Sequence, residues 1–180
     1  MPGGPSASFH IRTARTLLRP WRDEDASAFA AMNADLAVMV DMPALTRAES
    51  DTKLARYRAA YARHGLCRWR LEDRGGGFLG YVGLMPMAKT HPLGAGFEIG
   101  WRLVRSAWGQ GYVTEAARAA LEDAFQRARL AQVYSFTAPD NLRSQAVMTR
   151  LKLERRPELD FTDPPGPNGW RGLVWSAAAG

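Results

Sequence analysis

The chain has 180 residues, of which 46% are hydrophobic and 23% are charged, and it contains one cysteine. This size and composition favour a single folded domain over a disordered chain, and a lone thiol excludes an internal disulfide framework. The net charge of +6 comes mainly from arginines spread along the sequence. That distribution favours a solvated basic surface, so we expect no nucleic-acid partner.

Targeting and metal-binding signals are both weak. Residues 1–10 lack the charged and apolar regions of a secretory signal, and no apolar run approaches the length of a membrane span. We expect a cytoplasmic protein with no membrane partner. Three histidines and Cys67 do not form a zinc-ligand pattern, so no metal site is predicted. Residues 1–8 are expected to be a disordered lead-in, and residues 9–180 a single domain.

The first half of the chain predicts a strand, two helices and a hairpin. The strand is expected at Thr16–Arg19, and Asp23 is a candidate cap for the short helix that follows. The capping box from Thr46 to Glu49 predicts a second helix, which should end at Gly65. Two strands, at 67–72 and 78–85, flank a glycine-rich turn and indicate an antiparallel hairpin.

The second half predicts strands alternating with helices. A strand is expected at 97–103, a long helix from about Tyr112 to Arg129, a strand at 133–137 and a helix at 141–151. The long helix has apolar residues at helical spacing and should pack on a sheet. Short strands are expected near Leu159 and at Leu173–Trp175.

A glycine turn, Gly109-Gln110-Gly111, joins the strand at 97–103 to the long helix. Such a junction suits an anion, because backbone amides converge at a helix start and the helix dipole is positive there. The turn lacks the lysine and spacing of a P-loop and the third glycine of a dinucleotide fingerprint. A turn that merely requires positive φ is the structural alternative.

Four short motifs carry a resemblance to a known family. They are Glu98-Ile99-Gly100-Trp101, the run from Trp108 to Ala116, the early Leu18-Arg19-Pro20, and Asn141 followed by Ser144. Together they resemble the RimJ/RimL-like branch of the GNAT superfamily, the acyl-CoA-dependent N-acyltransferases, over about residues 9–176. The resemblance implies an α+β fold. Its central sheet would be mixed, mostly antiparallel, with about six or seven strands, splayed central strands and about four flanking helices.

The resemblance also implies acetyl-CoA as co-substrate, with no metal. Backbone groups of Trp101 and Leu103 would pair with the pantetheine arm, and Asn141 would contact the same arm. The pyrophosphate would receive amides from five consecutive residues, Gly109, Gln110, Gly111, Tyr112 and Val113. Thr114 would add a hydroxyl or a further amide.

Two residues are candidates for the proton transfers of acyl transfer. Glu98 is the candidate base, acting through one water; the alternative is an exposed strand glutamate paired with an arginine. Many members of the family have a tyrosine on the late helix that acts as the general acid, but the matching position here is Met148. Ser144 is therefore the candidate partner of the departing thiolate, and helix capping alone is its alternative role.

The chain departs from the family pattern at three places. Trp108 stands where the motif begins with Gln or Arg, and Val113 replaces a final Gly or Ala. Leu151-Lys152-Leu153 replaces the usual Leu-Gly-Phe, so a rearranged helix end is expected. The leading hypothesis is an N-acetyltransferase acting on a primary amine, either a protein or peptide amino terminus or a small molecule, as a monomer or homodimer. The alternative is a catalytically silent acyl-CoA-binding or sensing domain.

Overall fold

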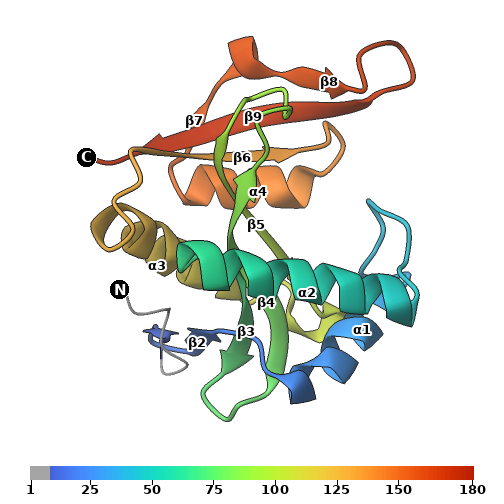
Figure 1. Ribbon diagram of the computed structural model, residues 1–180, viewed down its shortest axis with the longest axis vertical. Helices are drawn as coiled ribbons and strands as arrows, with labels where there is room; N and C mark the ends of the chain where they lie inside the picture. Colours follow the sequence, from blue (N-terminus) through green and yellow to red (C-terminus); the bar gives the residue numbers. More distant parts are fainter. Residues whose placement is uncertain (1–8) are drawn as a thin grey trace.

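The computed structural model describes residues 9–180; the lead-in expected at residues 1–8 lies outside that range (Figure 1). The strands described are β1 Ile11–Arg12, β2 Thr16–Arg19, β3 Arg68–Asp73, β4 Phe78–Met87, β5 Gly96–Leu103, β6 Gln132–Thr137, β7 Glu154–Arg155, β8 Phe161–Asp163 and β9 Trp170–Ala178. The α-helices are α1 Ala26–Ala34, α2 Arg47–His64, α3 Tyr112–Gln126 and α4 Leu142–Arg150.

These strands form an open, mostly antiparallel sheet in the order β1-β2-β3-β4-β5-β6-β9-β7, with β8 paired to β9. The exception is the β5–β6 neighbour pair, which is parallel and has one register pair, Glu98 with Tyr134. The sheet therefore splays between β5 and β6. The α+β class and the splayed central strands are confirmed. The strand number is higher than the six or seven expected, because β1 and β7 have two residues each and are too short to give a periodic signal.

The helices cover the sheet through aromatic and small residues. The rings of Phe29 on α1 and Tyr57 on α2 lie 6.0 and 5.6 Å from the ring of Tyr81 on β4. The buried side of α3 is made mainly of alanines and contacts β2, β4 and β5. Small side chains let this helix approach the sheet closely. No helix within residues 9–180 combines the length and apolar character needed to cross a membrane.

Most predicted helix ends are confirmed, and the exceptions have local causes. Thr46 and Glu49 form the capping box, and Gly65 closes α2 with φ 66°. Asp23 does not cap α1, because a 3-10 turn at Asp23–Asp25 precedes that helix and the Asp25 carboxylate accepts the Arg22 amide. The long helix ends at Gln126 rather than at residue 129. Leu159 lies in a 3-10 turn, Pro157–Leu159, so the strand expected there begins two residues later.

The end of α4 keeps a standard geometry despite its unusual sequence. Lys152 takes the left-handed conformation, φ 59°, that glycine usually adopts after a helix. Its amide donates to the Thr149 carbonyl, and the Leu153 amide donates to the Met148 carbonyl. These two bonds constitute a Schellman motif. The expected rearrangement is therefore wrong, because satisfying two helix-end carbonyls offsets the strain of a left-handed lysine, about 1–2 kcal/mol.

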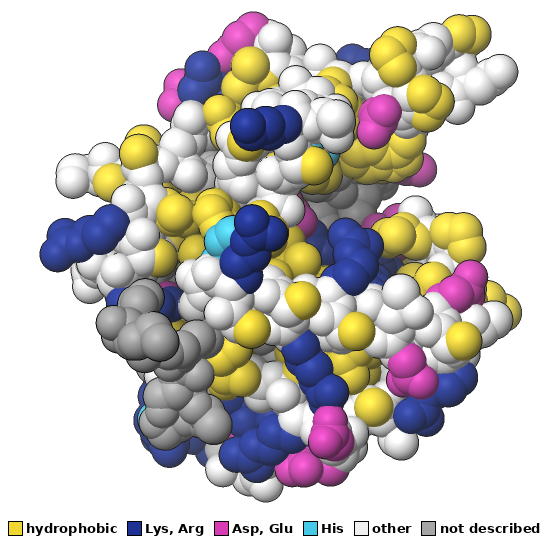
Figure 2. Space-filling model, in the orientation of Figure 1, with side chains coloured by type: hydrophobic (Ala, Val, Ile, Leu, Met, Phe, Trp, Pro, Cys, Tyr) yellow, Lys and Arg dark blue, Asp and Glu magenta, His cyan; other side chains and the backbone are white. Residues whose placement is uncertain are grey.

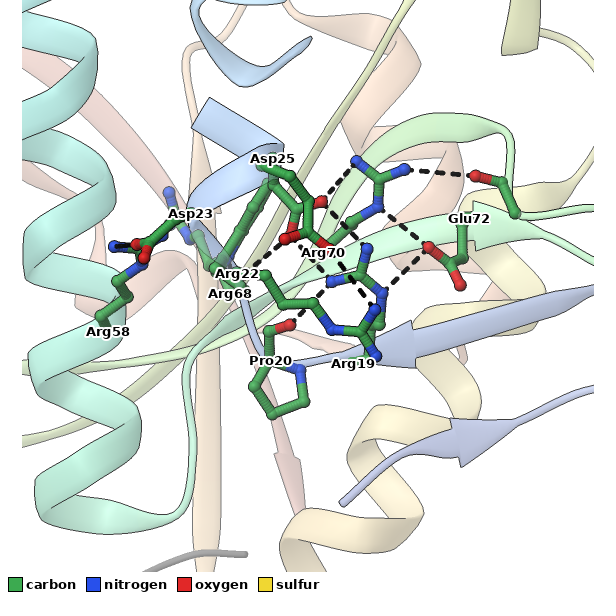
Figure 3. Close-up of polar contacts among 12 residues, drawn as sticks. Arg19, Pro20, Arg22, Asp23, Asp25, Arg58, Arg68, Arg70 and Glu72 are labelled. Carbon is green, nitrogen blue, oxygen red and sulfur yellow. Dashed lines mark hydrogen bonds and ion pairs between the residues drawn. The ribbon is translucent and has the colours of Figure 1, made fainter. Parts of the chain in front are cut away.

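The Leu18-Arg19-Pro20 motif anchors a buried charged network that joins β2, β3 and the turn before α1 (Figure 3). Arg19 forms two hydrogen bonds to the Asp25 carboxylate, at 2.7 and 2.9 Å. Arg70 lies 3.0 Å from the same carboxylate, and both arginines also contact Glu72. All four residues are buried. Two cations and two anions balance, so this network stabilises the fold and leaves no charge for a ligand.

Candidate active site

A cavity of about 900 Å³ opens beside the splayed strands. Its wall comes from the end of β5, the glycine turn, the first turn of α3, one side of α4 and part of the loop between α1 and α2. Most of the residues predicted to bind the co-substrate line it: Trp101, Leu103, Gly109, Gly111, Tyr112, Val113, Thr114 and Asn141. The structure thus brings together in one cavity residues that are far apart in the sequence.

The glycine turn presents free backbone amides to this cavity. Gly109 and Gly111 have φ of 75° and 79°, a conformation that side chains other than glycine adopt only at a cost. Gly111 is the N-cap of α3, and it supplies no side chain to bond the first amides of the helix. The amides of Tyr112, Val113 and Thr114 therefore have no intrahelical acceptor and point along the positive end of the helix dipole. This geometry fits phosphate oxygens.

Gln110 and Arg15 support the turn from outside. Gln110 does not line the cavity; its side-chain amide donates to the Ser106 carbonyl at 2.9 Å. Arg15 donates to the Gln110 carbonyl at 2.8 Å and is held by an ion pair with Glu115 at 2.7 Å. A role for the Gln110 side chain in binding is thus not supported by its position. Sequence reasoning missed Arg15, because a contact across 95 residues leaves no local pattern.

Trp108, which stands where the family motif begins with a polar residue, bonds the end of β5 and lines the cavity. Its indole Nε1 donates to the Leu103 carbonyl at 3.0 Å, so that carbonyl already has a partner. The Arg143 guanidinium lies 4.5 Å above the indole ring. Arg143 and Arg150 both line the cavity and were missed. Their separation of seven residues, two helical turns, was the available signal that they share one face of α4.

Asn141 and Ser144 lie together at the start of α4. The Asn141 side chain accepts the Ser144 amide at 3.1 Å, which confirms the predicted cap, and donates to Asp41 at 3.3 Å. Both residues line the cavity. The Ser144 hydroxyl has no hydrogen-bond partner within the described part of the chain and is free to bind a ligand. Met148, in contrast, is 1% exposed and belongs to the core.

Glu98 lies on β5 but does not line the cavity. One carboxylate oxygen forms an ion pair with the guanidinium of Arg68 on β3, and the Glu98 side chain is 13% exposed. The Arg68 guanidinium reaches Glu98 by passing over Gly100, where a Cβ would lie 2.5 Å from Nη2. The pairing with an arginine matches the alternative role, although the carboxylate is not exposed. Its second oxygen has no protein partner among residues 9–180.

His91 and Cys67 occupy structural positions. The His91 ring lies 5.1 Å from Phe136 and 5.3 Å from Phe161, and its Nδ1 accepts the Leu93 amide. This histidine is therefore half-buried. Cys67 is fully buried in the core, and burial raises the pKa of its thiol well above the ordinary value.

An open sheet splayed between parallel strands, with an uncapped helix start beside the opening, defines the class of GNAT-type acyltransferases. A family model described as an acetyltransferase (GNAT) domain matches residues 15–154. The chain therefore belongs to the GNAT acetyltransferase family, and it is an acetyltransferase.

Individual relatives agree with this assignment. The chain is 27% identical over 163 residues to a Bacillus subtilis protein named uncharacterized N-acetyltransferase YnaD, covering 89% of this chain and 92% of YnaD. A GNAT-family acetyltransferase from Bacillus anthracis superposes with a TM-score of 0.78 at 22% identity, over 95% of this chain and 99% of that chain. RimL, a ribosomal L7/L12 alpha-N-protein acetyltransferase in complex with coenzyme A, superposes with a TM-score of 0.77 at 13% identity, over 94% of this chain and 98% of that chain. The predicted membership of the GNAT superfamily is thus confirmed, and the solved structures share the fold of this chain.

Proposed function

We propose that acetyl-CoA binds in the 900 Å³ cavity and that its acetyl group passes to a primary amine. The observation that carries this proposal is the uncapped start of α3, where three free amides and two left-handed glycines face the cavity that also contains Ser144. Amides at a helix start bind phosphate groups, and Arg143 and Arg150 add positive charge to the same wall. These features fit an anionic nucleotide thioester.

Each predicted binding residue has a defined place in this proposal. Backbone amides of Gly109, Gly111, Tyr112, Val113 and Thr114 would hold the pyrophosphate, and the Thr114 hydroxyl would assist. Backbone groups of β5 at Trp101 and Leu103 would pair with the pantetheine arm, apart from the Leu103 carbonyl, which already accepts the Trp108 indole. Asn141 would bond the arm from the opposite side. Gln110 would contribute its amide only, because its side chain bonds Ser106.

The co-substrate supplies an activated acetyl group in a thioester. In the reaction the amine nitrogen forms a bond to the acetyl carbon, the carbon–sulfur bond breaks, and one proton moves from the amine to the thiolate. Glu98 would take up the amine proton through a water at its free carboxylate oxygen. Ser144 would hydrogen-bond the departing thiolate. The half-buried Arg68 guanidinium holds the Glu98 side chain in place through their ion pair.

The acceptor class remains a primary amine, on a protein or peptide amino terminus or on a small molecule. A reducing, cytoplasmic setting is supported by the buried, unpaired thiol of Cys67.

Acetyl-CoA is expected to raise the melting temperature of the purified protein by about 5 to 10 °C when present at about 100 times its dissociation constant. The measurement is a thermal melt with and without ligand, with free pantetheine, which lacks the nucleotide, as the matched control ligand. Gly111→Val should reduce the shift, because the β-branched residue cannot take φ 79° without strain. An unchanged melting temperature at millimolar acetyl-CoA would refute the proposed site.

Ser144→Ala is expected to lower turnover about 10- to 100-fold, because the thiolate loses a hydrogen-bond donor, while the acetyl-CoA melting shift is retained. Release of free thiol from acetyl-CoA in the presence of an amine panel measures the rate. Thr149→Ala is the control, since its hydroxyl is on the same helix but bonds the Gln145 carbonyl. Equal rates in both variants would remove the Ser144 hydroxyl from the mechanism. A melting shift without turnover on any amine would favour the silent binding domain.

A further inference from the structure

A cluster of basic side chains meets at the inner side of α2, separate from the glycine turn. It consists of Lys53 on α2, Arg68 on β3 and Arg102 on β5, and we call it the basic cluster. Tyr81 on β4 lies at its centre: Lys53 Nζ is 5.6 Å and Arg68 Cζ 5.7 Å from the Tyr81 ring centroid, and Arg102 is paired with Tyr81 in the β4–β5 register. Figure 2 shows a hollow above α2 with basic side chains at its base.

The basic cluster has one more positive charge than the carboxylates that face it. Glu98 pairs with Arg68, and Asp41 pairs with Arg102 at 2.9 Å. Lys53 is only half exposed and forms no ion pair with any residue the structure describes. An uncompensated charge at a partly buried position is costly. The cluster is therefore incomplete as a purely structural network, in contrast to the balanced network around Asp25.

The pKa values of Tyr81 and Lys53 reflect the same surplus of positive charge. Burial alone raises the pKa of the Tyr81 phenol, but the charges of Lys53, Arg68 and Arg102 lower it to about 8. Burial lowers the pKa of the Lys53 ammonium, and repulsion from the two arginines lowers it further. The space around Tyr81 is therefore at a positive electrostatic potential, which attracts an anion.

The basic cluster adjoins the proposed reaction centre on two sides. Arg102 and Asp41 belong to the wall of the cavity that contains Asn141 and Ser144. Arg68 holds the candidate base Glu98. A molecule bound at the cluster would therefore lie next to both groups proposed to move protons. The glycine turn, where the phosphates are proposed to bind, lies on a different part of the wall.

Resting on the proposed function, we propose that the acceptor amine carries a carboxylate and that the basic cluster binds this carboxylate. A bound carboxylate neutralises the surplus charge and places the amine of the same molecule near Glu98. The surplus positive potential of the empty cluster attracts the carboxylate and repels amines that carry only positive charge. Polycationic amines are excluded by the same potential.

The test compares matched amines that differ only in the carboxylate. Thiol release from acetyl-CoA is measured with free amino acids and their carboxamides, and with peptides that have Glu or Gln next to the amino terminus, which separates small-molecule from peptide acceptors. The carboxylate member of a pair is expected to have a kcat/KM about 10- to 100-fold higher, the usual effect of hydrogen bonds to a charged group. Equal values within every pair would overturn the inference.

Lys53→Met provides the variant, because it removes a cation without breaking an ion pair. It is expected to reduce the preference for the carboxylate member at least about threefold, and Arg56→Met, at an exposed position of the same helix, should leave the preference unchanged. An unaltered preference in Lys53→Met would contradict the assigned site. Absence of thiol release from every amine, together with no acetyl-CoA melting shift, would instead refute the proposed function on which the inference rests.

Discussion

Asp25→Ala is expected to lower the free energy of unfolding by about 3–5 kcal/mol, the cost of breaking a buried ion pair and leaving its partners unpaired. Asp25 is 2% exposed, and its carboxylate contacts Arg19, Arg70 and the Arg22 amide. Its loss leaves two buried guanidinium groups with Glu72 as their one remaining carboxylate. Urea unfolding of the wild type and the variant, at equal m-values, measures the difference.

Asp23→Ala in the same turn is the matched control, because the Asp23 side chain is 97% exposed and, among residues 9–180, forms an ion pair with Arg58 alone. Exposed ion pairs contribute about 0–1 kcal/mol, so this variant should unfold close to the wild type. A loss below about 1 kcal/mol in Asp25→Ala would show that the network contributes little to stability.

Low pH should reproduce, in the wild type, part of the stability loss expected for Asp25→Ala. Burial raises the pKa of Asp25, but bonds from Arg19 and Arg22 and the charge of Arg70 lower it below its ordinary value overall. A depressed carboxyl pKa gives a stabilising contribution that is complete above about pH 4, the unfolded value, and is lost as the pH falls through the folded value. Asp25→Ala lacks this contribution, so its stability should fall less steeply below pH 4.

Glu98→Gln is expected to lower turnover about 100-fold, the usual effect of losing a general base, and to leave acetyl-CoA binding nearly unchanged. Glutamine keeps the shape of the side chain and can still accept a hydrogen bond from Arg68, so the fold should be retained. Thiol release is measured from pH 6 to 9. A lower rate in the variant at every pH of this range is the expected result.

Glu122→Gln makes the same chemical change at an exposed position of α3 and should retain full activity. Turnover of Glu98→Gln within about threefold of the wild type would remove Glu98 from the mechanism and leave it as the structural partner of Arg68. The melting shift with acetyl-CoA separates this result from a failure to bind the co-substrate.

Features that depend on a few neighbouring residues were predictable from the sequence. The capping box at Thr46, the left-handed Gly65, the hairpin around its glycine turn and the Asn141 cap are all formed within one or two turns of chain. Backbone conformational preferences and local hydrogen bonds decide such features before any packing occurs. The glycine turn and the helix start proposed to bind the phosphates belong to the same group.

Only the tertiary structure decided which side chains meet across strands and helices. Glu98 pairs with Arg68 because the β3–β4–β5 register brings residues 30 positions apart onto one face of the sheet. The rotation of α4 buries Met148 and turns Ser144 and Arg143 toward the cavity. The surplus charge at Lys53 has the same origin. Register and helix rotation are set by the burial of the whole core, so no local pattern in the sequence determines these contacts.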